Sequence, residues 1–89
     1  MSRISFSDNA WEDYLYWQTQ DKKTIKKINA LLKDIERNGH DGIGKSEPLT
    51  ANLSGMWSKE IDKQNRLVYR ITEDGTIDVD QCRTHYGNK

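Results

Sequence analysis

A chain of 89 residues forms one small domain, and a domain of this size buries only about 60% of the surface that its unfolded chain exposes. With 31% charged and 34% hydrophobic residues, it has enough apolar side chains for a sheet covered by helices on one face, but not on both. Because 14 basic and 14 acidic residues cancel, the net charge alone does not indicate nucleic-acid binding.

Cysteine usage and hydropathy suggest the cellular compartment. The single cysteine, Cys82, has no partner for an intramolecular disulfide, and no apolar run is long enough for a signal peptide or a membrane span. We therefore expect a cytoplasmic protein that does not contact a membrane. Cys82 lies in a predicted strand and is expected to be packed rather than nucleophilic. His40 and His85 show no metal-ligand spacing with it, so we expect no metal site and no cofactor.

The N-terminal segment predicts a short strand followed by a helix. Residues 3–6 alternate between polar and apolar side chains, and Ser7 or Asp8 can cap a helix over residues 10–20. In this helix the residues at helical spacing are Trp11, Tyr14, Leu15 and Gln18. We interpret the aromatic side chains as structural rather than base-stacking, with Tyr16 or Trp17 as candidates for a dimer contact.

A second helix is predicted over residues 22–37 and should end at Asn38-Gly39. Its apolar stripe consists of Ile25, Ile28, Leu31, Leu32 and Ile35. Its other face carries six cations, namely Lys22, Lys23, Lys26, Lys27, Lys33 and Arg37. Such a face is usually only solvated, yet in this neutral chain it is the best candidate for contact with a phosphate-rich partner.

Residues 40–52 have no periodicity, and glycines together with Pro48 predict a loop. The glycine spacing does not match a phosphate-binding P-loop. Pro48 favours an extended conformation for Glu47, which would hold that carboxylate in a defined place.

The C-terminal part switches to period two. Residues 56–62, 65–72 and 76–84 predict three strands, and Asp74-Gly75 is a strong hairpin signal between the last two. In the middle strand Arg66, Val68 and Arg70 share one face. Together these elements predict an α+β fold over residues 1–89, in the order β-α-α-β-β-β, with two N-terminal helices packed on one face of a small antiparallel sheet.

Five motifs, taken in order, carry a resemblance to a known family. They are AWEDYLYW at residues 10–17, KSEPL at 45–49, NLSGMWS at 52–58, NRLVY at 65–69 and HY at 85–86. In them the chain resembles the YoeB-type toxins of the RelE/ParE superfamily nearly from end to end. The resemblance implies a RelE-like fold and the toxin of a type II toxin-antitoxin system. It also implies a ribosome-dependent endoribonuclease that cleaves messenger RNA in the ribosomal A site and so inhibits translation.

The resemblance also implies roles for particular residues. Glu47 would be the general base, Arg66 the phosphate clamp, His85 the general acid, and Tyr86 a residue that positions or stacks on RNA. These residue types suit attack by the ribose 2′-hydroxyl, because a carboxylate can accept its proton, an imidazole can protonate the departing 5′-oxygen, and a guanidinium stabilises the charged phosphate. The products would be a 2′,3′-cyclic phosphate and a 5′-hydroxyl, and no metal is required.

The chain departs from the family pattern at two positions. Thr50 and Glu60 stand where typical members carry basic residues, and Glu60 reverses the sign of the charge. We expect Lys45, Lys59 and Arg83 to supply the RNA-binding charge instead; otherwise activity is reduced. Arg70 could contribute as well, although Arg70 and Arg83 could equally form surface ion pairs with Glu60, Asp62 or Asp80.

The resemblance implies a cognate YefM-like antitoxin, contact with operator DNA only through that antitoxin, and a homodimer. The antitoxin should contribute a disordered segment that folds onto this domain. An alternative is a non-catalytic module of the same fold, either a gyrase inhibitor or an antitoxin-dependent transcriptional co-repressor. Relatives of the ParE type are not expected to carry Glu47, Arg66 and His85-Tyr86 together, which favours the nuclease.

Overall fold

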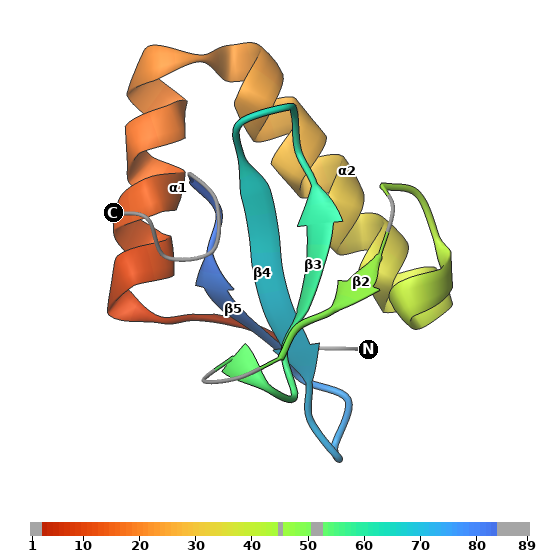
Figure 1. Ribbon diagram of the computed structural model, residues 1–89. Helices are drawn as coiled ribbons and strands as arrows, with labels where there is room; N and C mark the ends of the chain where they lie inside the picture. The colour runs from red at the N-terminus through yellow and green to blue at the C-terminus, as the bar shows by residue number, and fades with distance from the viewer. Residues whose placement is uncertain (1–2, 45, 51–52, 84–89) are drawn as a thin grey trace.

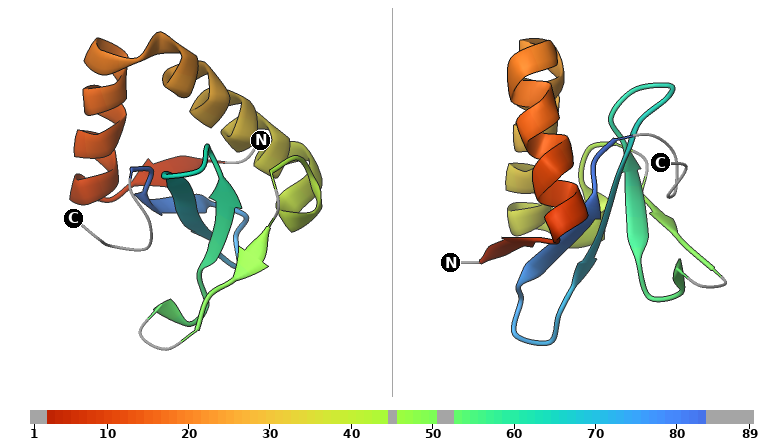
Figure 2. Two further views of the ribbon diagram at one scale, coloured as in Figure 1. Left: turned by 45° about the horizontal axis from the view of Figure 1, so that its top comes forward. Right: turned by 90° about the vertical axis from the view of Figure 1, so that its left-hand side faces the viewer.

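The computed structural model describes residues 3–44, 46–50 and 53–83. Its elements are β1 (Ile4–Phe6), α1 (Asp8–Gln20), α2 (Lys22–Asn38), the 3-10 helix η1 (Gly39–Asp41), β2 (Glu47–Pro48), β3 (Trp57–Glu60), β4 (Arg66–Ile71) and β5 (Ile77–Gln81). One five-stranded sheet has the order β1-β5-β4-β3-β2, and both helices cover the same face of it (Figure 1, Figure 2). The predicted α+β class with two helices on one face is confirmed. None of the described helices is long and apolar enough to cross a membrane.

The sheet is mixed rather than wholly antiparallel. Strands β2 to β5 pair antiparallel with their neighbours, whereas β1 runs parallel to β5, with Ile4 opposite Ile77. Parallel neighbours need a long connection, which the helices and the intervening strands supply. The short strand β2 was not predicted as a strand, but it consists of Glu47 and Pro48, the segment for which the sequence predicts an extended backbone.

The core lies between α2 and the sheet. Four residues of the predicted stripe of α2 are buried, namely Ile28, Leu31, Leu32 and Ile35, while Ile25 is half-buried. They form one cluster with apolar residues of β4 and β5, among them Leu67 and Tyr69, both fully buried. Leu67 and Tyr69 therefore face the helices, and Arg66 and Arg70 face the other side, as the strand alternation predicts.

Helix α1 packs through a different face from the predicted one. Trp11 and Leu15 are 48% and 41% exposed, whereas Ala10 and Asp13 are buried. Asp13 lies outside the predicted stripe, but its carboxylate accepts a hydrogen bond from the backbone N–H of Cys82 at 3.0 Å. A buried carboxylate with such a partner belongs to the packed face.

The chain that leaves β5 is fixed to α1 at Cys82. The indole Nε1 of Trp17 donates to the carbonyl oxygen of Cys82 at 2.8 Å, so both backbone groups of this residue are bonded to α1. Ser7, the predicted N-cap of α1, accepts from the backbone N of Ala10 and donates to the carbonyl of Asp80 at 2.9 Å. Cys82 is itself fully buried, as expected for a packed residue.

Replacement of Asp13 by alanine should lower the free energy of unfolding by about 1–3 kcal/mol, because the buried N–H of Cys82 loses its acceptor. Asp13→Asn keeps an acceptor oxygen and should cost less. Urea unfolding followed by tryptophan fluorescence measures both variants. Equal losses for the two would contradict the importance of this hydrogen bond.

Candidate active site on the helix-free face of the sheet

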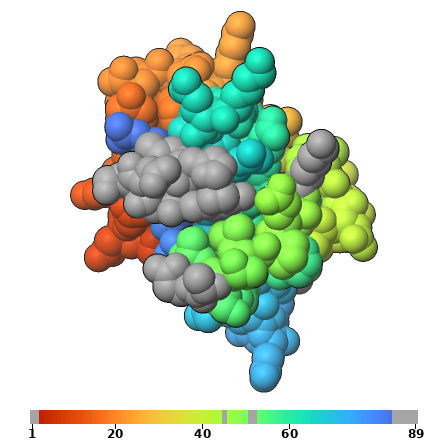
Figure 3. Space-filling model, viewed as in Figure 1, coloured from red at the N-terminus to blue at the C-terminus, as the bar shows by residue number. Residues whose placement is uncertain are grey.

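The face of the sheet opposite α1 and α2, here called the helix-free face, carries Glu47. In the pairing register Glu47 lies opposite Ser58, and Ser58 lies opposite Val68. These three residues form a row across β2, β3 and β4, in which Glu47 is exposed and the other two are fully buried. Figure 3 views the molecule from this face.

Arg66 begins β4 on the same face. It lies opposite Glu60 of β3, and its Nη1 donates to Glu60 Oε1 at 3.2 Å. The Arg66 side chain is 17% exposed and that of Glu60 is 43% exposed. The Nε atom of Arg66 is buried and has no hydrogen-bond partner among the described residues.

Glu47 and Arg66 are two strands apart and offset by two residues along the sheet. Ideal strand spacings place their Cα atoms about 12 Å apart. Both side chains are long, so they can approach a ligand that lies between them. The structure therefore brings two of the predicted site residues to one face.

The predicted residues Lys45, His85 and Tyr86 lie outside the described residues, so their place in the site stays a prediction. Arg83 follows β5, and its guanidinium lies over the ring of Tyr16 in α1, 3.8 Å from the ring centroid. This cation–π contact holds the Arg83 side chain against α1.

Lys59 lies on the opposite side of the sheet from Glu60. It is fully buried, and its Nζ donates to the carbonyl oxygens of Ile43 at 2.8 Å and His40 at 3.3 Å. The expected contact of Lys59 with RNA does not fit this position. The physical reason is strand alternation, since neighbouring residues of β3 face opposite sides of the sheet.

The buried amine belongs to a polar cluster that sequence reasoning missed. His40 stacks on Trp57 with ring centroids 3.9 Å apart, and its Nδ1 lies 2.8 Å from the hydroxyl of Tyr69. Burial, followed by the nearby Lys59 ammonium, holds the pKa of His40 below its ordinary value of 6.5. Burial also lowers the pKa of Lys59 and raises that of Tyr69. The cluster fixes the loop that leads into β2.

The glycine of this loop serves packing. A Cβ added to Gly42 would lie 1.4 Å from Asp34 Oδ2, which accepts the backbone N–H of Ile43 at 2.8 Å. Only glycine permits so close an approach to α2. Gly42 therefore has a structural role in packing the loop against α2.

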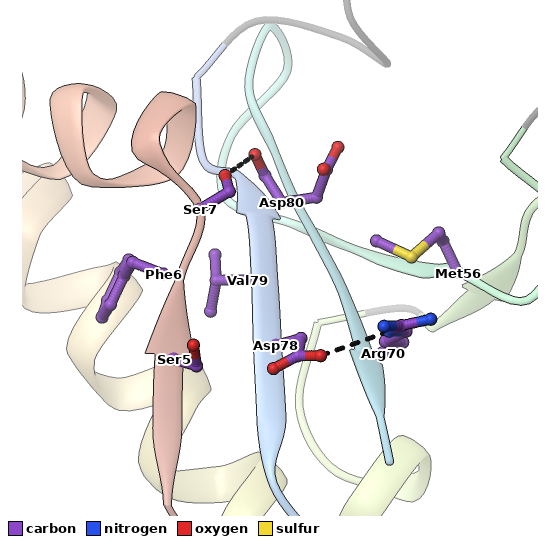
Figure 4. A pocket seen from close by; sticks show the side chains of 8 residues that line it. All are labelled: Ser5, Phe6, Ser7, Met56, Arg70, Asp78, Val79 and Asp80. Atoms are coloured by element: carbon purple, nitrogen blue, oxygen red, sulfur yellow. Dashed lines mark hydrogen bonds and ion pairs between the residues drawn. The ribbon is translucent and has the colours of Figure 1, made fainter.

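A cavity of about 330 Å³ lies farther along the sheet, between β1 and β4 (Figure 4). Its polar lining includes Arg70, Asp78 and Asp80, and Arg70 Nε donates to Asp78 Oδ2 at 3.3 Å. Neither Glu47 nor Arg66 lines it. Arg70 thus forms the surface ion pair that was the alternative to RNA contact. In the described part of the chain, no three His, Cys, Asp or Glu residues group closely enough to hold a metal ion.

Comparisons with known proteins agree with this architecture. A family model described as "YoeB-like toxin of bacterial type II toxin-antitoxin system" matches residues 6–86. Toxin YoeB of Escherichia coli strain K12 is 49% identical over 84 residues, which cover 94% of this chain and 99% of that protein. The YoeB-YefM complex from Staphylococcus aureus has a TM-score of 0.88 at 47% identity, with 97% and 99% of the two chains covered. The YoeB dimer from the same species has a TM-score of 0.87 at 50% identity, with 96% and 98% covered.

The mixed sheet with two helices on one face thus defines a small toxin of the RelE/ParE superfamily. Since the family model spans most of the chain and relatives are about half identical, the chain belongs to the YoeB-like toxins of bacterial type II toxin-antitoxin systems. The resemblance read from the five motifs is confirmed.

Stability should fall as the pH is lowered from about 7.5 to 5.5, because His40 has a lower pKa in the folded than in the unfolded chain. The unfolded chain then takes up the proton more readily, so stability is complete above about pH 7 and decreases as the pH falls through 6.5. His40→Phe retains a ring against Trp57 and should flatten this dependence of the melting temperature on pH. His85→Gln is the control for the second histidine, and an unchanged slope in His40→Phe would contradict the assignment.

Proposed function

We propose that this YoeB-like toxin is a ribosome-dependent endoribonuclease that cleaves messenger RNA in the A site and so stops translation. The observation that carries the proposal is that Glu47 and Arg66, from different strands, share the helix-free face. A carboxylate that can accept a proton and a guanidinium that can bind a phosphate thereby lie on one face of the sheet.

In the proposed reaction, Glu47 accepts the proton of the ribose 2′-hydroxyl as its oxygen attacks the phosphorus. Arg66 stabilises the charge that develops on the phosphate oxygens. His85 donates a proton to the 5′-oxygen as the bond between phosphorus and that oxygen breaks, and Tyr86 positions the RNA. The products are a 2′,3′-cyclic phosphate and a 5′-hydroxyl, and these steps need no metal ion.

The attachment of Cys82 to α1 supports the role of the last residues. His85 lies three residues beyond Cys82, whose N–H and C=O are both bonded to side chains of α1. A general acid benefits from such a fixed attachment because its geometry must be reproducible.

The proposed partners follow from the family. We propose that a YefM-like antitoxin binds this toxin, in line with the YoeB-YefM complex of the Staphylococcus aureus relative, and that the toxin contacts operator DNA only through it. A homodimer is proposed in line with the YoeB dimer of that species. Lys45 and Arg83 remain candidates for RNA contact, and the cytoplasm is the compartment in which the ribosomal substrate occurs.

The direct test is incubation of the purified toxin with messenger RNA programmed on ribosomes, followed by mapping of the new 5′ ends. We expect cuts within the A-site codon that carry a 5′-hydroxyl. Absence of any new ends with active ribosomes would reject the nuclease and leave the non-catalytic alternative.

Glu47→Gln and His85→Gln should each lower the single-turnover cleavage rate by roughly 10²-fold or more, the usual scale for loss of a general base or acid. Glu12→Gln, an exposed residue of α1, serves as the matched control and should cleave normally. Full activity in either site variant would remove the role assigned to that residue.

Arg66→Lys should lower the same rate by about 10²-fold, because an ammonium lacks the planar pair of donors that a guanidinium directs at phosphate. Arg70→Lys, on the same strand but in an ion pair with Asp78, is the control. Similar rates for wild type and Arg66→Lys would show that only the positive charge matters.

A further inference from the structure

The ion pair between Glu60 and Arg66 places a carboxylate on the arginine proposed to bind phosphate. Nη1 of Arg66 donates to Glu60 Oε1 at 3.2 Å, across a directly opposed pair of residues on β3 and β4. Carboxylate and phosphate oxygens compete for the same donors of a guanidinium. Glu60 therefore occupies part of the surface on which a substrate phosphate would bind.

The two side chains of the pair differ in their exposure to solvent. The Arg66 side chain is 17% exposed, and its buried Nε has no hydrogen-bond partner among the described residues. The Glu60 side chain is 43% exposed, so it can turn into solvent at little cost. A ligand with several acceptor oxygens can thus displace Glu60 and use further donors of the guanidinium.

The charges of the ion pair cancel at the proposed phosphate site. Glu60 neutralises Arg66 on the helix-free face, and Glu47 lies on the same face, two strands away. One cation of α2, Lys27, lines a shallow pocket together with Glu60. A phosphate that approaches Arg66 therefore meets the carboxylate of Glu60 as well as the guanidinium.

We propose that Glu60 is an affinity-determining residue that occupies the phosphate position on Arg66 and must be displaced when the RNA backbone binds. The inference rests on the proposed function, because it takes Arg66 as the phosphate clamp. RNA that is free in solution binds weakly, and part of its binding free energy is used to displace Glu60. RNA held beside the toxin by a larger assembly has a high effective concentration and displaces the carboxylate readily. Glu60 thus favours RNA that is presented to the site over free RNA.

The test is binding of a single-stranded RNA of about 12 nucleotides with 2′-O-methyl sugars, which cannot be cleaved. Glu60→Gln keeps the shape of the side chain without its charge and should bind this RNA about 5-fold more tightly than wild type. Its affinity should also depend more steeply on salt, by about 0.7 in the log-log slope for one additional phosphate contact. Glu73→Gln, an exposed residue of the β4–β5 turn, is the charge-matched control and should bind like wild type.

A double-mutant cycle with Arg66→Gln distinguishes displacement from general repulsion. If Glu60 acts through Arg66, the gain from Glu60→Gln should fall below about 2-fold in the Arg66→Gln background. A gain of the same size in both backgrounds, or unchanged or weaker binding by Glu60→Gln alone, would overturn the proposal. Thermal melting of each variant verifies that it is folded.

The binding measurement does not depend on cleavage, so the two proposals can fail separately. A toxin that does not cut ribosome-bound message, but whose Glu60→Gln variant gains affinity through Arg66, would refute the nuclease alone. Cleavage with the predicted ends and no gain in binding would refute only the role of Glu60.

Discussion

Strand register is the constraint on which the candidate site depends. Side chains of β3 and β4 alternate between the two faces, so a slip of one residue would move Arg66 into the core and Tyr69 out of it. The register is held from the core side, where Leu67 and Tyr69 are fully buried and Lys59 is bonded to two carbonyl groups. The residues that position Glu60 and Arg66 are therefore buried on the opposite face of the sheet.

The sequence predicts much of this arrangement where the signals are local. The turn at Asp74-Gly75 and the alternation of β4 place Arg66 and Val68 on the face opposite Leu67, as observed. The packed face of α1 could not be predicted this way, because Asp13 accepts its hydrogen bond from Cys82, 69 residues later in the chain. The parallel pairing of β1 with β5 could not be predicted for the same reason, since no local pattern specifies a strand's distant neighbour.

The candidate site likewise has features that the sequence predicts and features that it does not. Glu47 and Arg66 were predicted as site residues from the family motifs at residues 45–49 and 65–69. Pro48 predicts the extended backbone of Glu47. Lys59 was predicted to contact RNA because of its charge. The alternation predicted for residues 56–62, however, already placed Lys59 and Glu60 on different faces of the sheet. No signal along the chain indicates that His40 stacks on Trp57, because the contact joins a loop to a strand that is distant in sequence.

The ion pair at Arg66 bears on how RNA can reach the proposed site. Arg66 Nη1 donates to Glu60, and Lys27 of α2 lines a shallow pocket with the same glutamate. In the proposed function, a phosphate of the RNA must therefore displace Glu60 before it can use that donor of the guanidinium. RNA held beside the toxin by a ribosome would have a high effective concentration and would displace the carboxylate more readily than free RNA. The pairing of Glu60 with Arg66 is thus consistent with a proposed nuclease that acts on presented RNA.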